Sequence, residues 1–362
     1  APEMEALVLA DPGYGVDFAM ARYDIFYHYS DDQGGERAFQ FCELNADGSS
    51  SMNESRALYE AFVKTDALGE LGEETGFGTP ELFDTWIDVL LTDYRSFAGT
   101  GAVEKPRIVI ADFKGEGIES EFGEFLRRME ARGLSARIAD PRDLRYRSGA
   151  LYIEEDKVDI VYRRATTARV MAHYREVQDF IRAYREGAVC VIGGFTSQII
   201  HNKMIFAVLH DTANGELFTE GERRFIRSHI PYTEVLTAEN AHIYKEEPQA
   251  WLLKPFDQYG AHGIHMGRDM DAAAWRQAVE ESAAAGGYLV QAACRVPRLP
   301  MLTVEEDRVF FEPYYYLIGL FQYNESFAGF YSRTGRRHII ASHGGEACTV
   351  PNFVQGLADA GR

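Results

Sequence analysis

Cysteine and basic side chains are scarce in this sequence, and each shortage excludes a class of protein. The cysteines are Cys42, Cys190, Cys294 and Cys348, which lie far apart and form no C-x-x-C pair. This spacing provides neither a disulfide framework nor a cysteine metal site, and it is typical of a reducing compartment. With 37 Lys and Arg against 56 Asp and Glu, the formal charge is −19. Such a surface repels nucleic-acid phosphates and anionic membranes, so we expect neither as a partner.

Long apolar runs are also lacking. No stretch approaches the roughly 18 apolar residues that a membrane-spanning helix needs. The first ten residues contain acids instead of the basic segment that begins a signal peptide. We therefore expect a cytoplasmic location.

Apolar and aromatic residues, by contrast, are plentiful enough for a large core. The chain has 362 residues, of which 46% are hydrophobic, and it includes 23 Phe and 20 Tyr. This length exceeds that of one typical compact domain, so we expect two or three subdomains.

Two apolar segments near the beginning of the chain predict paired strands. They cover residues 17–30 and 38–45, and the second alternates in polarity as a half-buried strand does. The turn-forming residues 31–35 lie between them. We expect a hairpin or two neighbouring strands with carboxylates at the ends. Helical periodicity follows at 53–65 and 81–95, separated by the glycine-rich residues 69–80.

A new unit begins at Pro106 and has the pattern of alternating strands and helices, which predicts an open α/β sheet. Strands are expected at 107–112, 136–140, 158–164 and 188–192, with helices at 119–132, up to about 185, and at 199–209. The turn after the first strand, 113–117, lacks the full glycine fingerprint, so we interpret it as scaffold and not as a dinucleotide site. Later strands are expected at 251–254, 263–266 and 288–292, with a helix at 271–285 and a β-rich end at 309–353.

Two lysines lie where phosphate groups can be held. Lys254 ends an apolar strand and precedes a loop with Gly260 and Gly263, whose backbone N–H groups can approach phosphate oxygens. A solvated strand edge is the alternative interpretation. Lys203 follows Asn202 at the start of an apolar helix, where the helix dipole disfavours a cation unless an anion is present. An exposed lysine on an amphipathic helix explains Lys203 equally well.

Oxygen ligands for a hard cation occur earlier in the chain. Glu43 and Asn45 are two residues apart and so lie on one face of a strand, and Asp24 adds a carboxylate on the expected neighbouring strand. Mg²⁺ prefers oxygen ligands and is usually held by one or two carboxylates plus substrate phosphates. The alternative is ordinary surface acids, although an unpaired carboxylate at Glu43 is costly in so apolar a strand.

Two further residues have weaker signals. Gln291 ends a strand and can belong to a hinge that offers backbone groups to adenine. Arg333 lies in the β-rich region and can bind a carboxylate or a γ-phosphate through two hydrogen bonds.

In their order along the chain, these segments resemble the ATP-grasp enzymes in circularly permuted form, best known from glutathionylspermidine synthase. That family has R-x-D, E-x-N-A-D, an N-K segment, a K-P-x-x-x-x-G loop, a Q-x-x-V hinge and a late arginine. The matching positions are Arg22/Asp24, residues 43–47, Asn202/Lys203, Lys254/Pro255, Gln291 and Arg333. Carboxylates that precede the lysines indicate the permutation. The resemblance covers roughly residues 20–355.

The resemblance implies an α/β (α+β) architecture, an ATP-grasp fold in permuted order with a βαβ subdomain like the pre-ATP-grasp domain. Residues 1–104 are expected to form the part of the core that carries the metal ligands. Residues 105–187 are expected to form the βαβ subdomain. Residues 188–362 are expected to hold the nucleotide-binding part and the β-rich end.

The resemblance also implies an ADP-forming ligase that joins a small-molecule or peptide carboxylate to an amine through an acyl phosphate. In that reaction ATP and Mg²⁺ are required. The implied nucleotide-binding residues are Lys203, Lys254, Gly260, Gly263 and Gln291. Asp24, Glu43 and Asn45 are the implied Mg²⁺ ligands, and Arg22 and Arg333 stabilise the phosphoryl group in transfer.

Two segments depart from the glutathionylspermidine synthase pattern. Residues 258–263 read Q-Y-G-A-H-G where those enzymes have G-R-E-G-A-N, and Asp47-Gly48-Ser49 replaces D-T-P. The acid and the amine are therefore expected to differ. Alternative functions are a kinase-like ATP-grasp phosphotransferase and an inactive nucleotide-binding module, and the presence of all three metal ligands argues against the second.

Overall fold

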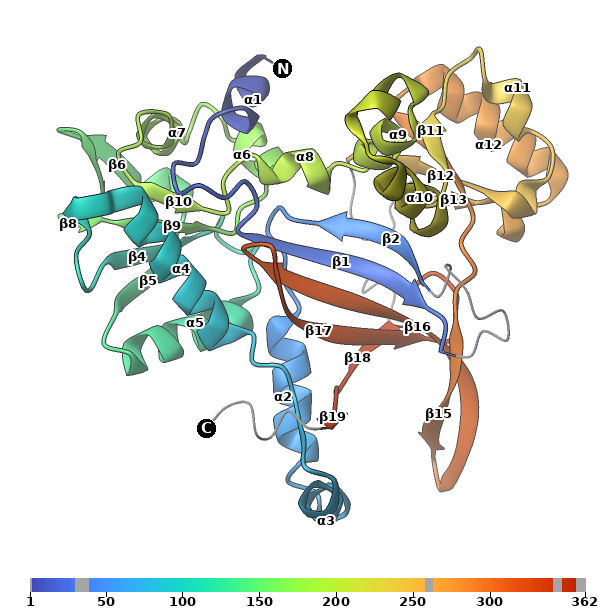
Figure 1. Ribbon diagram of the computed structural model, residues 1–362, viewed down its shortest axis with the longest axis horizontal. Coiled ribbons are helices and arrows are strands. Elements are labelled where there is room, and N and C mark those ends of the chain that lie inside the picture. Colours follow the sequence, from blue (N-terminus) through green and yellow to red (C-terminus); the bar gives the residue numbers. More distant parts are fainter. Residues whose placement is uncertain (1, 30–38, 258–262, 341–346, 356–362) are drawn as a thin grey trace.

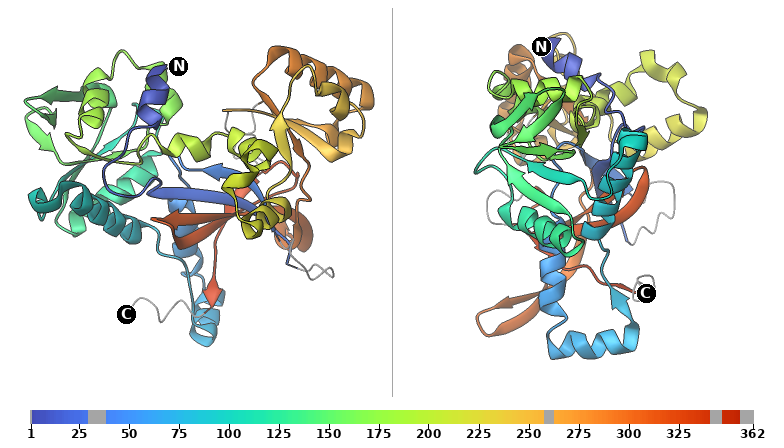
Figure 2. Two further views of the ribbon diagram at one scale, coloured as in Figure 1. Left: turned by 45° about the horizontal axis from the view of Figure 1, so that its top comes forward. Right: turned by 90° about the vertical axis from the view of Figure 1, so that its left-hand side faces the viewer.

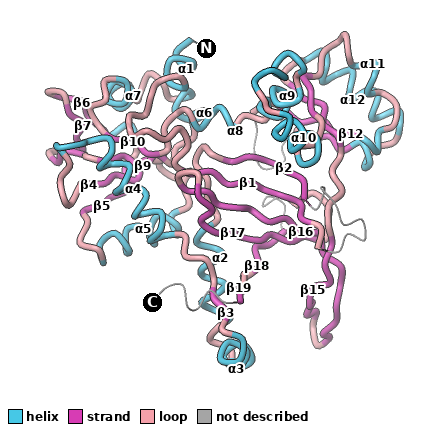
Figure 3. The backbone as a smooth tube through the Cα atoms, viewed as in Figure 1, coloured by secondary structure: helices cyan, strands magenta, loops and turns pink. Residues whose placement is uncertain are grey.

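The computed structural model describes residues 2–29, 39–257, 263–340 and 347–355, and its strands form three larger sheets and two small ones (Figure 1). Figure 2 shows the same ribbon from two further sides, and Figure 3 colours the backbone by secondary structure. Within these residues, no helix has the length and apolar character needed to cross a membrane.

An antiparallel sheet combines strands from both ends of the described chain. Its path is β18-β17-β16-β1-β2, and β15 also pairs with β16. The strands are β1 (Met20–Tyr27), β2 (Phe39–Asn45), β15 (Arg298–Glu305), β16 (Arg308–Tyr323), β17 (Ser326–Gly335) and β18 (Ala347–Val350). The expected pairing of the first two apolar segments is confirmed, because β1 and β2 are antiparallel neighbours. The turn predicted at 31–35 lies outside the described residues.

A parallel sheet, in the order β10-β9-β4-β5, forms the expected open α/β unit. Its strands are β4 (Arg107–Ala111), β5 (Ser135–Ala139), β9 (Ile160–Arg163) and β10 (Cys190–Ile192). A three-stranded antiparallel sheet accompanies it and consists of β6 (Leu144–Arg147), β7 (Ala150–Ile153) and β8 (Asp156–Val158). The carboxyl ends of the parallel strands share one edge, which is the usual ligand-binding edge of such a sheet.

The third sheet has the order β11-β14-β12-β13 and is antiparallel. It contains β11 (Thr233–Val235), β12 (Trp251–Pro255), β13 (His265–Met266) and β14 (Tyr288–Ala292), with β3 (Phe77–Gly78) and β19 (Val354–Gln355) forming a separate pair. The two strands predicted on either side of the Lys254 loop therefore do pair with each other.

The helices are α1 (Pro2–Val8), α2 (Met52–Phe62), α3 (Asp66–Thr75), α4 (Phe83–Ala98), α5 (Glu119–Ala131), α6 (Thr167–Ala172), α7 (Gln178–Arg185), α8 (Ser197–His201), α9 (Met204–His210), α10 (Glu220–His229), α11 (Ala241–Tyr244) and α12 (Ala272–Ala285). Figure 1 shows α4 and α5 beside the parallel sheet and α12 beside the third sheet, whereas α3 projects away from the three larger sheets. Short 3₁₀ turns lie at Gly99–Gly101, Pro141–Asp143, Thr212–Leu217, Pro248–Ala250 and Gly267–Asp269.

Helix α3 differs from the sequence-based expectation of a glycine-rich connection at 69–80. The helix begins at Asp66 and ends at Thr75, and Gly76 follows with a φ of 62°. A side chain at Gly72 would meet the ring of Phe77 at 3.3 Å, so glycine there allows close packing of that ring. The glycines therefore serve the packing and the end of a helix instead of breaking it.

The helix predicted at 199–209 is two helices, α8 and α9. The break occurs at Asn202, whose ψ of 126° is extended, and the next N–H, that of Lys203, donates to the carbonyl of Phe256. An amide that bonds to another segment cannot continue the helix ladder. The helix predicted up to residue 185 is likewise divided, into α6 and α7.

The largest hydrophobic cluster lies between α4, the parallel sheet and the antiparallel sheet. Trp86, Ile87 and Leu90 of α4 are fully buried in it together with Phe125 of α5 and Phe321 of β16. Because β16 and α4 are far apart in the chain, this cluster joins the C-terminal strands to the α/β unit. The relative position of the two sheets is thus fixed by apolar packing.

The position of strand β10 is relevant to the expected boundary at residue 187 between the α/β subdomain and the C-terminal part. The strand lies beyond residue 187, yet it pairs with β9 in the parallel sheet. We propose that the α/β unit ends after β10, at Gly193-Gly194, and that residues 1–104 belong with the C-terminal strands in a discontinuous core.

Candidate active site

Strands β1 and β2 bring the predicted metal ligands together. In the antiparallel register Asp24 lies opposite Glu43, and Arg22 lies opposite Asn45. The register then shifts by one residue, which makes Cys42 the extra residue of a β-bulge. A bulge bends its strand and changes the direction of nearby side chains. Here it lies beside both carboxylates.

Arg22 and Asp24 form a buried bidentate ion pair. The Nε–Oδ1 distance is 2.7 Å, the second nitrogen–oxygen distance is 2.9 Å, and another Arg22 nitrogen donates to the carbonyl of Ser50 at 2.9 Å. The amide of Asn45 donates to Asp24 at 3.4 Å. Burial raises the pKa of Asp24 above its ordinary value, and the Arg22 guanidinium opposes this effect. Arg22 therefore holds the direction of Asp24 and the position of the following loop.

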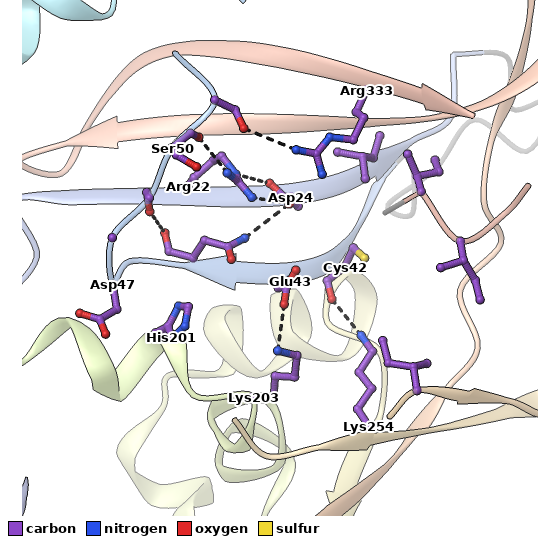
Figure 4. Close-up of a pocket in the computed structure, with 18 of the residues that line it drawn as sticks. Arg22, Asp24, Cys42, Glu43, Asp47, Ser50, His201, Lys203, Lys254 and Arg333 are labelled. Carbon is purple, nitrogen blue, oxygen red and sulfur yellow. Dashed lines mark hydrogen bonds and ion pairs between the residues drawn. The ribbon is translucent and has the colours of Figure 1, made fainter. Parts of the chain in front are cut away.

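Each predicted phosphate-binding lysine contacts β2 (Figure 4). The Nζ atom of Lys203 is 2.9 Å from Glu43 Oε1, and Lys254 Nζ donates to the Cys42 carbonyl at 3.2 Å. Burial raises the pKa of Glu43, but the two ammonium groups outweigh burial and leave it below its ordinary value. Glu43 is thus ionised, and the bulge supplies the carbonyl that Lys254 uses.

Arg333 reaches the same place from β17. It lies opposite Leu317 of β16 and donates to Ser51 Oγ at 3.4 Å. The guanidinium carbons of Arg333 and Arg22 lie 5.3 Å and 5.0 Å from the centroid of the Tyr331 ring. Burial raises the pKa of Tyr331 to about 12, so its phenol stays neutral. The two predicted catalytic arginines therefore share one aromatic neighbour.

These side chains line one cavity of about 850 Å³. Of the predicted site residues, the cavity collects Arg22, Asp24, Glu43, Asn45, Lys203, Lys254, Gln291 and Arg333. Their roles remain predictions, but residues from two sheets and one helix junction do face a common space.

Three predicted positions require separate comment. Gly260 lies outside the described residues. Gly263 is described, with a φ of 69°, and it does not line the cavity. Gln291 lines the cavity, yet its side-chain amide donates to Thr233 Oγ1 at 2.9 Å and is buried. The backbone here is also engaged, because Gln291 pairs with both β11 and β12 and the N–H of Ala292 donates to the Tyr232 carbonyl. The hinge hypothesis therefore stays a prediction.

The wall beyond Lys254 is apolar. It includes Leu252, Met266, Val296, Leu317 and Ile340. Such a surface suits a flat ring better than a phosphate.

Two cysteines also lie in this wall. Burial raises the pKa of the Cys42 thiol to about 12 and that of Cys294 to about 11. Both are therefore uncharged thiols at neutral pH and poor nucleophiles.

The loop after β2 is tied to the α/β unit by residues that the sequence did not single out for a site role. Asp47 is 2.5 Å from Arg163 and accepts a hydrogen bond from Ser197 Oγ at 3.0 Å. Burial raises the pKa of Asp47, but Arg163, His201 and the N–H of Thr167 together outweigh burial and leave the pKa below its ordinary value. A Cβ on Gly48 would lie 2.6 Å from the carbonyl oxygen of Arg164, so only glycine fits there. This loop forms a fixed wall of the cavity.

The first turn of α2 is fixed by a second buried ion pair. Glu121 Oε2 accepts from the backbone N–H groups of Ser51 and Met52 at 3.1 and 3.0 Å, and Glu121 Oε1 is 2.9 Å from Arg164. Ser51 has a φ of 89°, an uncommon conformation for a residue with a side chain. The Glu121 bonds hold this strained turn against the cavity.

Further lining residues come from the carboxyl edge of the parallel sheet and from α8. They are Asp112, Glu116, Thr166, Arg169 and His201. Figure 4 shows His201 beside Asp47, next to Lys203. The Asp of E-x-N-A-D, Asp47, was visible in the sequence as part of a family-like segment. No sequence pattern marked Asp112 or His201, because only the tertiary fold carries them to the cavity.

One of the similar solved structures shares this architecture. A glutathione synthetase-like effector from Globodera pallida, solved in its apo form, matches over 91% of this chain and 77% of its own, with 13% identity and a TM-score of 0.56. D-alanyl-alanine synthetase A from Vibrio cholerae matches over 59% of this chain and 68% of its own, with 14% identity and a TM-score of 0.37. Comparison with curated protein sequences yields no match.

The likeness to the effector concerns the fold alone, because its identity is so low. The sequence carries the family assignment. The family described as circularly permuted ATP-grasp type 2 matches residues 117–327, which is more than half of the chain. The resemblance seen in the order of the motifs is confirmed: this chain belongs to the circularly permuted ATP-grasp type 2 family.

Proposed function

We propose that this protein is an ADP-forming ligase that joins a carboxylate to an amine through an acyl phosphate. Members of the ATP-grasp family are mostly ATP-dependent carboxylate–amine ligases, and family membership implies that ATP binds. The observation that carries the proposal is that two lysines contact β2 beside the carboxylates Asp24 and Glu43, and that all four side chains line one cavity of about 850 Å³.

The cavity has a gradient of polarity that suits a nucleotide. Adenine fits the apolar wall next to Lys254, in the cavity that Gln291 also lines. Lys254 and Lys203 then meet the α- and β-phosphates. Binding requires that both ammonium groups exchange their present partners, Glu43 and the Cys42 carbonyl, for phosphate oxygens. Lys203 exchanges one anionic partner for another, and Lys254 gains an anionic partner in place of a neutral carbonyl.

Asp24, Glu43 and Asn45 fit a Mg²⁺ ion by their chemistry, since two carboxylates and one amide oxygen are hard donors. Within the described residues, no group of three or more His, Cys, Asp or Glu side chains is arranged to hold a metal alone. That donor count agrees with an ion that also takes phosphate oxygens as ligands. When bound, Mg²⁺ would neutralise charge on the β- and γ-phosphates.

The arginines are placed for the first chemical step. The substrate carboxylate attacks the γ-phosphorus, the bond to the β-phosphate oxygen breaks, and ADP leaves. Arg333 and Arg22 lie where they can stabilise the charge that spreads over the phosphoryl oxygens. Because Asp24 already occupies two nitrogens of Arg22, Arg333 is the more available of the two.

In the second step the amine lone pair attacks the acyl carbon. The carbon–oxygen bond to phosphate breaks, and phosphate leaves with the bonding electron pair. The amine nitrogen loses one proton to solvent or to a nearby base. The fixed loop 46–51 and the α2 turn position the two substrates, since proximity supplies much of the rate in such a transfer.

The test is ADP and phosphate release measured for a panel of carboxylic acids crossed with primary amines. We expect release to depend on both an acid and an amine, and Glu43→Ala to lower the rate by about 100-fold. Glu130→Ala, at an exposed position of α5, is the matched control and should keep full activity.

Two results would count against the proposal. Full turnover in Glu43→Ala would remove the site assignment. ADP release with a stable phosphorylated product, independent of any amine, would identify a phosphotransferase instead of a ligase.

A further inference from the structure

The carboxylates that line the cavity differ in whether they form an ion pair with a basic side chain. Among the described residues these carboxylates are Asp24, Glu43, Asp47, Asp112 and Glu116. All but one form an ion pair with an arginine or lysine of this chain; the pairs are Arg22–Asp24, Lys203–Glu43, Arg163–Asp47 and Arg169–Glu116. The exception is Asp112.

Asp112 follows β4 at the carboxyl edge of the parallel sheet. Its Oδ1 atom accepts a hydrogen bond from the N–H of Phe113 at 2.8 Å. Within the part of the chain that the structure describes, Asp112 forms no ion pair. Gly117 closes one side of it with backbone only, because a Cβ there would lie 2.9 Å from Oδ2. One carboxylate oxygen is therefore left for a ligand.

The Arg164 guanidinium acts on this charge but is already paired with another carboxylate. Arg164 lies close enough to act on Asp112, but it forms an ion pair with Glu121 at 2.9 Å and donates to Tyr162 at 2.9 Å. Burial raises the pKa of Asp112 above its ordinary value. An ionised carboxylate without a counter-ion is costly in a partly buried place, and a cationic ligand would repay that cost.

The position of Asp112 separates it from the nucleotide. Lys254 and the apolar wall belong to the third sheet and the antiparallel sheet, whereas Asp112 belongs to the α/β unit on the opposite side of the fold in Figure 1. Open parallel sheets bind ligands at their carboxyl edge. If the nucleotide binds at Lys203 and Lys254, the carboxyl edge of the parallel sheet is left for a co-substrate.

We propose that Asp112 binds the ammonium group of the amine co-substrate, which therefore enters as a primary amine in its cationic form. The proposal rests on the proposed ligase function and specifies the amine side of that reaction. The contact is charge-assisted and holds the amine before it is deprotonated for attack.

Hydroxylamine separates the two halves of the reaction. It is uncharged at neutral pH and traps acyl phosphates as hydroxamates without an ammonium group, so hydroxamate formation reports acid activation alone. In Asp112→Asn we expect unchanged hydroxamate formation for the acids that respond in the wild type. For cationic primary amines, we expect the KM of ADP release to rise at least about tenfold.

Asp140→Asn is the matched control. Asp140 follows β5 at the same edge of the sheet, is paired with Arg142 and does not line the cavity, so the KM for the amine should not change. Thermal unfolding gives a second readout. Because Asp112 is an uncompensated charge, Asp112→Asn should have a Tm equal to or above that of the wild type.

The possible results distinguish this inference from the function on which it rests. An unchanged KM for amines in Asp112→Asn, with hydroxamate formed by the wild type, overturns the inference alone. A wild type that forms no hydroxamate with any acid overturns the proposed ligase function and the inference with it. An equal loss of hydroxamate and amine turnover in Asp112→Asn would assign Asp112 to acid activation and overturn the amine site.

Discussion

Asp47 joins the strand that carries the metal ligands to the α/β unit. Its carboxylate is fully enclosed and bonds to Arg163, to the hydroxyl of Ser197 and to the backbone N–H of Thr167. Removal of one partner of a buried ion pair leaves the other charge without compensation. A single residue therefore governs both the stability of this junction and the shape of the cavity wall.

We expect Asp47→Asn to lower the free energy of unfolding at pH 7 by about 3 kcal/mol, the low end for a broken buried pair, because Arg163 keeps its bonds to backbone carbonyls. The pKa of Asp47 is lower in the folded state than in the unfolded chain. Its contribution is thus complete above the unfolded pKa and is lost as the pH falls through the folded one. Urea unfolding at a series of pH values measures this effect.

The comparison variant for Asp47→Asn is Asp143→Asn, at an exposed position of a 3₁₀ turn. It should change the free energy of unfolding by less than about 0.5 kcal/mol. Equal stability of wild type and Asp47→Asn at pH 7 would contradict the assigned role of the ion pair.

For single residues, the sequence identified which side chains belong to the candidate site better than it identified their ion-pair partners. Glu43 was marked because an unpaired carboxylate is costly in an apolar strand, and its counter-ion proved to be Lys203. Periodicity and spacing cannot pair two residues that lie so far apart. No sequence pattern indicated a role for Asp112. Its proposed role depends on the lack of an ion pair within the described residues, which only the three-dimensional structure shows.

The junction between α8 and α9 is the element that places Lys203. Asn202 Oδ1 accepts from the N–H of Met204 at 3.0 Å, and the N–H of Lys203 donates to the Phe256 carbonyl at 3.0 Å. The Asn202 side chain, one residue before the N-cap position, thus satisfies the first N–H of α9, as a capping side chain does. The break directs Lys203 toward β2, which a continuous helix would not do at the same position.

We expect Asn202→Ala to cost about 1 kcal/mol of stability and also to weaken binding of a Mg²⁺-bound, non-hydrolysable ATP analogue. The second effect follows because the backbone at Lys203 is no longer held. Isothermal titration measures the affinity, and urea unfolding measures the stability.

Thr219→Ala provides the control for this cap. Thr219 caps α10 with a capping box and does not line the cavity, so a similar loss of stability should leave nucleotide affinity unchanged. If both variants bind the analogue as the wild type does, the junction has no part in nucleotide binding.

Elements whose residues follow a strong helical or strand periodicity lie close to the limits that the sequence predicted. Strand β4 and helices α5 and α12 lie within one residue of their predicted limits at nearly every end. Failures occurred where a long-range bond or a close contact decided the backbone. The helix predicted at 199–209 is interrupted because the N–H of Lys203 donates to the Phe256 carbonyl, and α3 forms although it contains glycines.

For the whole molecule, the cavity is a junction between three sheets. Arg22 and Glu43 come from the antiparallel sheet, Lys254 from the third sheet, and Arg164 from the α/β unit. A ligand that contacts all three sheets stabilises the native arrangement of the sheets. The unfolded chain has no such site and does not bind the ligand. The effect of the ligand on stability follows from mass action.

We expect a non-hydrolysable ATP analogue with Mg²⁺, at about 100 times its Kd, to stabilise the protein by about 2.7 kcal/mol, seen as a higher Tm. Chelation of Mg²⁺ should remove most of this gain, because Asp24 and Glu43 then face phosphate charge directly. Differential scanning calorimetry measures both states.

Lys254→Ala should lose most of the gain in Tm, whereas Lys245→Ala, a lysine of the same chain outside the cavity, should retain it. A Tm that does not respond to the analogue with Mg²⁺ in the wild type would exclude nucleotide binding at this cavity.

The sequence by itself determined the family, the α/β class and the identity of most polar groups in the cavity. Residue types and their order are local information, and the motifs from Arg22 to Arg333 preserve that order. The tertiary structure decided which charges meet. The β-bulge at Cys42 supplied Lys254 with a carbonyl, and ion pairs compensated four cavity carboxylates. Among the residues that the structure describes, Asp112 has no such ion pair. Electrostatic balance depends on distances in space, and distance along the chain does not encode them.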